Sequence, residues 1–131
     1  MFSYKNNNLQ PLIIKERRID NDSVILFTNA RDEPNIGEWV AHHLLLGFDK
    51  VVIFDHLSKV PIVKFLGTNF NNRLSIIPVS GGGNIKLNLM NNALEIGKNG
   101  NYSWMLYLDA DEYLNLNGFD NIKNYLGYFK E

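Results

Sequence analysis

The chain has 131 residues, 45% hydrophobic and 21% charged, which is ordinary for a soluble globular protein, and we treat residues 1–131 as a single domain. Thirteen Lys and Arg residues nearly balance fourteen Asp and Glu residues, and this formal charge of −1 argues against a nucleic acid partner. Because the chain has no cysteine, no apolar stretch long enough for a membrane span and no apolar block of a signal peptide, we expect a cytoplasmic protein.

The first half of the chain predicts two strands and a helix. Residues 24–28 form a β-prone apolar run after a turn-like Asp-Asn-Asp-Ser segment, which predicts a buried strand. Apolar residues then recur at helical spacing over 36–46, and Gly47 ends that pattern. A second strand is predicted at 51–54, followed by a short helix within 61–66.

The second half continues the alternation. A third strand is predicted at 74–79, and the Gly-rich turn 80–84 separates it from a helix whose apolar stripe extends from Leu87 to Gly97. The run 104–108 predicts a fourth strand, and apolar residues from Phe119 onward mark one face of a last helix that reaches the chain end.

Strands that alternate with helices predict an α/β fold, with a mostly parallel sheet sandwiched by helices in a doubly wound, Rossmann-like arrangement. In such folds the loops at the carboxyl ends of the strands form the binding crevice. The polar residues that follow each strand are therefore the candidates for a functional site.

The most informative segment is the strand 104–108, which leads directly into Asp109, Asp111 and Glu112. If Ala110 is extended, Asp109 and Asp111 point to the same side and can share one cation. Ligation by carboxylates alone favours Mg²⁺ or Mn²⁺, which usually complete their shell with phosphate oxygens and water. Taken alone the motif is weak, because acidic residues are common at solvated strand ends.

Two other strand ends carry polar residues. Arg31 and Glu33 follow the first strand, and Asp55 ends the second. Carboxylates there are suitable acceptors for ribose hydroxyls and base N–H groups, and a guanidinium group matches phosphate oxygens. Asp55 and Ser58 are equally compatible with turn or cap roles. His42 and His43 lie on the first helix and are predicted to be packing residues.

Four ordered segments together resemble glycosyltransferases of the family 2-like group, especially the branch that includes family 92. These are Arg-Asp-Glu-Pro at 31–34, the Glu-Trp-x-x-x-His-x-x-x-Gly helix at 38–47, the strand ending Asp-His-Leu-Ser at 55–58, and Trp-x-x-x-x-Asp-x-Asp-Glu-Tyr at 104–113. The resemblance implies the A-type glycosyltransferase fold and a divalent metal, Mn²⁺ or Mg²⁺. It also implies a UDP- or GDP-linked sugar donor and a glycan or protein hydroxyl as acceptor.

Position by position, the resemblance implies donor contacts from Thr28, Arg31, Glu33, Asp55 and Asp109, and metal ligation by Asp109 and Asp111. Glu38, Trp39 and His43 match as well, and as helical residues they are predicted to lock their helix to its neighbours.

The chain departs from the family pattern in two respects. Arg31-Asp32 replaces Lys-Asn and His56 replaces a small polar residue, so the preferred base cannot be inferred. Family members also continue well beyond the Asp-x-Asp element, with segments that bind the acceptor and supply a catalytic base. The sequence is therefore predicted to be truncated after that element, as an amino-terminal donor-binding part. Its catalytic base is unknown, since Glu112 lies beside the metal ligands, and open core surface would favour a homo-oligomer.

Three functions follow from this pattern. The first is metal-dependent sugar transfer from a nucleotide-diphosphate donor. The second is a catalytically incomplete glycosyltransferase-like module for nucleotide binding or assembly. The third is nucleotidyltransferase-like phosphate chemistry that uses the same acidic pair.

Overall fold

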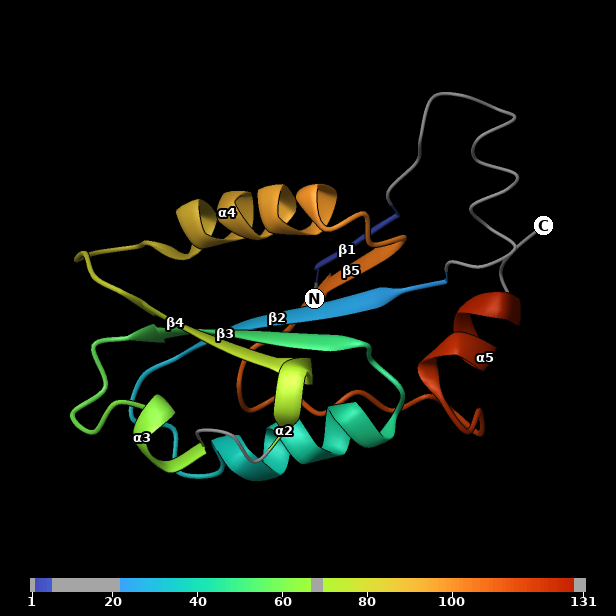
Figure 1. Cartoon of the computed structure of the whole chain (residues 1–131), viewed down its shortest axis with the longest axis horizontal. Coiled ribbons are helices and arrows are strands. Elements are labelled where there is room, and N and C mark those ends of the chain that lie inside the picture. The colour runs from blue at the N-terminus through green and yellow to red at the C-terminus, as the bar shows by residue number, and fades with distance from the viewer. Residues whose placement is uncertain (1, 6–21, 67–69, 129–131) are drawn as a thin grey trace.

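The structure is a computed structural model that describes residues 2–5, 22–66 and 70–128 (Figure 1). Its centre is a five-stranded sheet with the strand order β1-β5-β2-β3-β4. β2, β3, β4 and β5 are parallel, and β1 pairs antiparallel with β5 at one edge. The strands are β1 (Phe2–Lys5), β2 (Val24–Ala30), β3 (Lys50–His56), β4 (Leu74–Val79) and β5 (Trp104–Tyr107).

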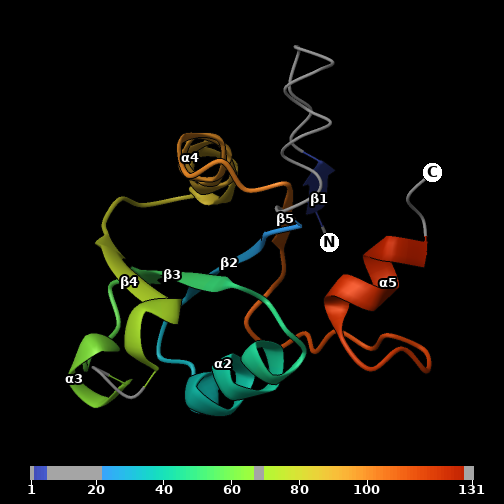
Figure 2. The ribbon, with the colours of Figure 1, turned by 45° about the vertical axis from the view of Figure 1, so that its right-hand side comes forward.

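Helices cover both faces of this sheet. Figure 2 shows α4 alone on one face, with α2 and α3 on the other and α5 beside them. The helices are α2 (Ile36–Leu45), α3 (Val63–Leu66), α4 (Lys86–Asn99) and α5 (Ile122–Tyr128), with a 3₁₀ turn at Asn71–Arg73. The predicted α/β class with a mostly parallel, doubly covered sheet is confirmed. In the described part of the chain, no helix combines the length and apolar character that crossing a membrane requires.

Strand alternation divides the core into two layers. In β2, Val24 and Leu26 pack on the α2 side, whereas Ile25 and Phe27 pack on the α4 side. The same alternation continues in β3 and β5, because successive side chains of a strand point to opposite faces. A strand with both faces buried must be apolar throughout, which explains why these strands read as unbroken apolar runs.

The predicted elements all occur, with small shifts at their ends. Gly47 ends α2 in the left-handed region with φ 102°, as its position predicted. The last helix begins at Ile122, so the prediction of a start at Phe119 is wrong; Phe119 lies in the preceding loop and packs edge-on against Tyr125. The strand β1 was not predicted, since four residues are too few to show a pattern. The predicted end of the last helix at 129–131 lies outside the described residues.

Close packing of α4 on β5 depends on Gly97. A Cβ atom at this position would lie 2.2 Å from the Sδ atom of Met105, which is fully buried. We expect Gly97→Ala to lower the free energy of unfolding by about 1–3 kcal/mol, the usual result of overpacking a core, as measured by urea denaturation. Gly127→Ala in α5 is the matched control, because nothing lies within 4 Å of its Cβ position. Unchanged stability of Gly97→Ala would contradict the described contact between α4 and β5.

Candidate functional site

The carboxyl ends of the parallel strands meet at one edge of the sheet. After β2 the chain adds β3 and then β4 on one side of β2, and the connecting helices α2 and α3 cover one face of the sheet. It then crosses the opposite face through α4 and adds β5 on the other side of β2. The order therefore reverses between β2 and β5, and sheets of this kind bind ligands at such a point. Register places Asp55 beside Ala30, and Phe27 beside Tyr107, so the loops after β2, β3 and β5 are neighbours.

The acidic segment after β5 is a tight turn. The Glu112 N–H donates to the Asp109 carbonyl at 3.0 Å, and the Asp109 N–H donates to Glu112 Oε1 at 2.9 Å. Ala110 is a buried corner of this turn, whereas Asp109 and Asp111 are exposed. Ala110 is not extended, so the condition under which Asp109 and Asp111 would point to the same side of a strand is not met; the Glu112 carboxylate closes the turn instead. We name residues 109–112 the acidic turn.

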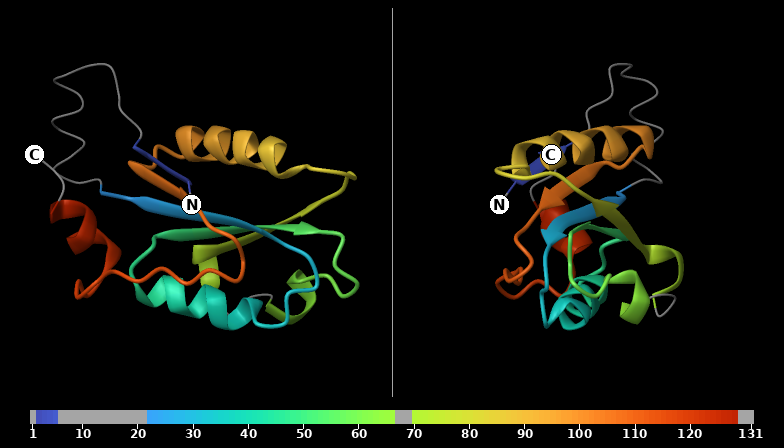
Figure 3. Two further views of the ribbon diagram at one scale, coloured as in Figure 1. Left: turned by 180° about the vertical axis from the view of Figure 1, so that it is seen from behind. Right: turned by 90° about the vertical axis from the view of Figure 1, so that its left-hand side faces the viewer.

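Side chains of α2 hold the backbone that leaves the acidic turn. The indole N–H of Trp39 donates to the Glu112 carbonyl at 2.7 Å. The Leu114 N–H donates to His43 Nε2 at 3.2 Å, and His42 Nε2 lies 3.1 Å from the Leu114 carbonyl. The predicted packing role of these helical residues is confirmed, and it positions the acidic turn. The left view of Figure 3 shows this segment passing along α2 toward α5.

The hydrogen bonds of His43 define its protonation. Because Nε2 accepts the Leu114 N–H, Nδ1 must carry the ring proton and donate it to the Trp39 carbonyl, 2.9 Å away. Burial lowers the pKa of His43 to about 4, with the nearby His42 ring adding to the effect and the Trp39 carbonyl opposing it. His43 is therefore a neutral structural residue at pH 7.

A lysine lies beside the first carboxylate of the acidic turn. Lys86, the first residue of α4, forms an ion pair with Asp109, and its Nζ atom lies 5.9 Å from the centroid of the Tyr107 ring. The Tyr107 hydroxyl donates to Asn29 Oδ1 at 2.7 Å, and burial raises the pKa of this tyrosine. The two paired side chains are 43% and 51% exposed, so the pair contributes at most about 1 kcal/mol to stability.

Asp55 is buried, and both of its carboxylate oxygens accept hydrogen bonds from the loop after β3. Oδ2 accepts from the Ile62 N–H at 2.9 Å and Oδ1 from the Ser58 N–H at 3.3 Å. Ser58 Oγ in turn accepts from the Asp32 N–H at 3.0 Å, which joins this loop to the one after β2. Asp55 therefore fixes the conformation of the loop after β3, which agrees with the turn role that the sequence left open.

The remaining predicted donor residues differ in exposure. Thr28 is fully buried inside β2, and its hydroxyl lies 3.4 Å from the Asn29 carbonyl. Arg31 is exposed, and Glu33 is partly exposed at the wall of a hollow of about 260 Å³ between the loops after β2 and β3. Phe65 and Val60 supply its apolar wall. The structure thus brings Arg31, Glu33 and Asp109 to the open edge and leaves Thr28 in the core.

A divalent cation fits this site only if substrate completes its shell. Within residues 22–66 and 70–128, no three His, Cys, Asp or Glu side chains gather closely enough to hold a metal ion. The exposed carboxylates of Asp111 and Asp109 are compatible with Mg²⁺ or Mn²⁺, which commonly use one or two carboxylates together with phosphate oxygens. Metal binding by Asp109 would require Lys86 to move away.

Lys86 was missed from the sequence as a residue of the site. It had one available signal, because a lysine in the first turn of a helix opposes the helix dipole and so indicates an anionic partner. Asp32 was noted as a polar residue after the first strand, but its structural role was not predicted: its backbone adopts a positive φ of 54°, and its Oδ1 accepts the Lys59 N–H at 2.7 Å across 27 residues of sequence.

Comparison with known proteins gives no match to a family model, to a curated protein or to a solved structure. Any function assigned to the site therefore has to be argued from its own residues.

Proposed function

We propose that this chain binds a nucleotide-diphosphate sugar at the sheet edge between β5 and β2, as the donor-binding part of a metal-dependent glycosyltransferase. The observation that carries the proposal is the acidic turn, with two exposed carboxylates at the point where the strand order reverses. The ordered motifs that resemble family 2-like glycosyltransferases support the same function.

Each side chain that is exposed at this edge of the sheet has a role in the proposed binding. Asp111 and Asp109 would hold the cation, which would neutralise charge on the donor's diphosphate. Lys86, once released from Asp109, is a second positive group for a phosphate oxygen, and Arg31 at the next strand end is a third. Glu33 accepts hydrogen bonds from ribose or base beside the apolar wall of its hollow. These contacts bind and orient the donor without supplying a base.

A binding module without transferase activity is the second candidate. It is favoured because the carboxylates of Glu112 and Asp55, which lie near the site, are both engaged in structural hydrogen bonds. Glu112 accepts the Asp109 N–H, and Asp55 accepts two backbone N–H groups, so neither is placed to take a proton from an acceptor hydroxyl.

Calorimetric titration with UDP and GDP, with and without Mn²⁺, tests the shared binding step. We expect Mn²⁺-dependent binding of one nucleotide by the wild-type chain. Asp111→Asn should weaken it by more than about tenfold, because even groups that only orient metal ligands are typically worth that much. Asp120→Asn is the control, since Asp120 is an exposed carboxylate in the loop before α5.

Absence of nucleotide binding, or equal binding by Asp111→Asn, would disprove the proposal. Sugar release from a nucleotide sugar by the same samples would favour the transferase over the binding module. Pyrophosphate exchange with nucleoside triphosphates would instead favour nucleotidyltransferase chemistry.

A further inference from the structure

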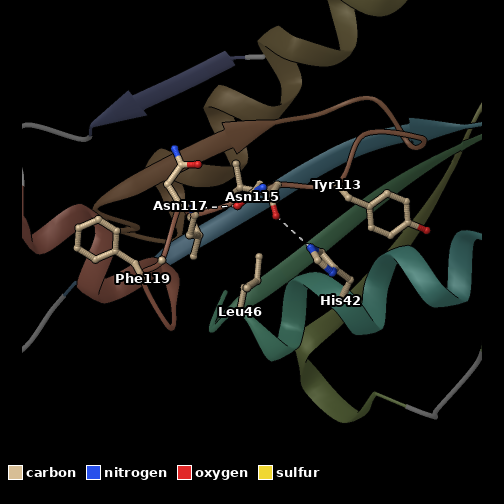
Figure 4. Close-up of a pocket in the computed structure, with 9 residues that line it drawn as sticks. His42, Leu46, Tyr113, Asn115, Asn117 and Phe119 are labelled. Atoms are coloured by element: carbon tan, nitrogen blue, oxygen red, sulfur yellow. Dashed lines mark hydrogen bonds between the residues drawn. The ribbon is translucent and has the colours of Figure 1, made fainter.

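A second hollow lies between the carboxyl-terminal half of α2 and the loop that follows the acidic turn (Figure 4). Its volume is about 430 Å³, within the range of roughly 300–1,000 Å³ that is usual for small-molecule sites. Tyr113 lies at one end, directly after the acidic turn, and Phe119 lies at the other. The hollow therefore begins beside the proposed donor site and leads away from it.

The walls of this hollow are fixed by hydrogen bonds and ring contacts. His42 Nε2 donates to the Leu114 carbonyl, and Asn115 Oδ1 accepts the Asn117 N–H at 2.9 Å. The Ile122 N–H donates to the Leu46 carbonyl at 2.6 Å and so ties α5 to the end of α2. A ligand would meet a largely preformed surface.

Among the side chains that line this hollow, His42 is the only one with an acid–base group that titrates near neutral pH in model peptides. None of its nine residues carries a carboxylate, an ammonium or a guanidinium group. Its polar side-chain groups are the exposed amides of Asn115 and Asn117, the ring of His42 and, at one end, the Tyr113 hydroxyl. In the neutral ring, donation by Nε2 leaves Nδ1 as an acceptor, and among the described residues Nδ1 has no hydrogen-bond partner. Aromatic surface comes from Phe119 and from Tyr113, which is 41% exposed.

Amide groups and aromatic surface without a fixed charge favour one chemical class of ligand. An anion would find no fixed positive charge, a cation no carboxylate, and a purely apolar ligand would bury amide groups without partners. A sugar ring avoids all three penalties. Its hydroxyl groups both donate and accept hydrogen bonds, as amide side chains require, and its C–H face can pack against an aromatic ring.

We propose that this hollow binds an uncharged sugar unit of the acceptor glycan. This inference rests on the proposed transferase function and names the acceptor class, which is a neutral glycan. The Tyr113 hydroxyl lies 3.4 Å from Glu38 Oε1 in the first turn of α2, which places this end of the hollow toward the carboxyl edge of the sheet. A glycan seated here can extend past Tyr113 toward the acidic turn.

The test is a titration of the ¹⁵N-labelled chain, followed by amide chemical shifts. The probes are maltotriose, cellotriose and chitotriose as neutral sugars, and a sialylated trisaccharide as the charged one. We expect saturable shifts from a neutral sugar, confined to residues 113–119 and the second half of α2. Asn115→Ala should weaken that binding about fivefold, the usual worth of a lost hydrogen bond. His42→Phe, which keeps a ring against Tyr113 but removes the acceptor, should weaken it similarly.

Two controls separate this site from the donor site. Asn92→Ala removes an exposed amide from α4 on the opposite face of the sheet and should leave sugar binding unchanged. Asp111→Asn should weaken nucleotide binding by more than about tenfold and keep sugar binding. If the wild-type chain binds the sugar but no nucleotide, the hollow is confirmed and the transferase proposal fails.

Three results would overturn the inference: no shifts with any neutral sugar, shifts that lie outside the hollow or persist in Asn115→Ala and His42→Phe, and tighter binding of the sialylated probe than of every neutral one.

Discussion

Asp55→Ala should destabilise the chain by about 3 kcal/mol, among the largest effects that we expect from a single polar substitution. Asp55 is only 6% exposed, and its two carboxylate oxygens accept the N–H groups of Ser58 and Ile62. Hydrogen bonds to a charged group are worth about 1.5–3 kcal/mol each, and removal of the acceptor leaves buried N–H groups unpaired. Urea denaturation at pH 7 measures the loss.

Asp55→Asn provides the graded comparison, because its single carbonyl oxygen can replace only one of the two acceptors and should cost about half as much. Asp111→Ala is the matched surface control and should change stability by less than about 0.5 kcal/mol. If Asp55→Ala proved as stable as the wild type while losing nucleotide affinity, Asp55 would be a ligand contact and its assignment to the loop would be wrong.

Acidification should destabilise the chain through His43. Its pKa is about 4 in the folded chain and near 6.5 in the unfolded chain, so between these values the unfolded state binds more protons. The contribution of the neutral ring is fully present above pH 6.5 and declines as the pH falls toward 4, by about 3 kcal/mol in total. Urea unfolding at steps from pH 8 to pH 4 measures the decline.

His43→Gln should flatten this pH dependence, since a glutamine amide does not titrate and can still accept the Leu114 N–H. His42→Gln, on the preceding residue, removes only the smallest contribution to the lowered pKa of His43 and should keep most of the decline between pH 6.5 and pH 4. An NMR titration of the ring protons gives the pKa directly. A value near 6.5 in the folded chain would contradict the buried, neutral His43.

The strands of the parallel sheet and most helices could be predicted because each has a local pattern of apolar residues in the sequence. The runs in β2, β3 and β5 are apolar throughout, as both of their faces are covered, and the stripe on α4 recurs at helical spacing. β1 and the start of α5 were missed for opposite reasons. β1 is too short to show a period, and Phe119 continues the apolar spacing of α5 although it packs from a loop.

The location of the candidate site could be predicted from the sequence, but the conformation of its residues could not. The carboxylates follow β5 directly in the sequence, and the pairing of β5 with β2 brings them close to the loop after β2. The conformation of Ala110 depends on a hydrogen bond from Asp109 to the Glu112 side chain, which competes with an extended strand. Asp55 has the residue type of a ligand, but its two partners belong to a loop whose path the sequence does not reveal.

The hold of α2 on the acidic turn also has a consequence for folding. The hydrogen bonds from Trp39 to Glu112 and from Leu114 to His43 join residues 73 and 71 positions apart in the chain. Because the entropy of closing a loop is lost before such a distant contact can form, we expect these contacts to form after the intervening strands have assembled. A peptide of residues 104–114 in isolation would lack this support. The proposed cation affinity should therefore emerge late in refolding, together with the final tertiary contacts.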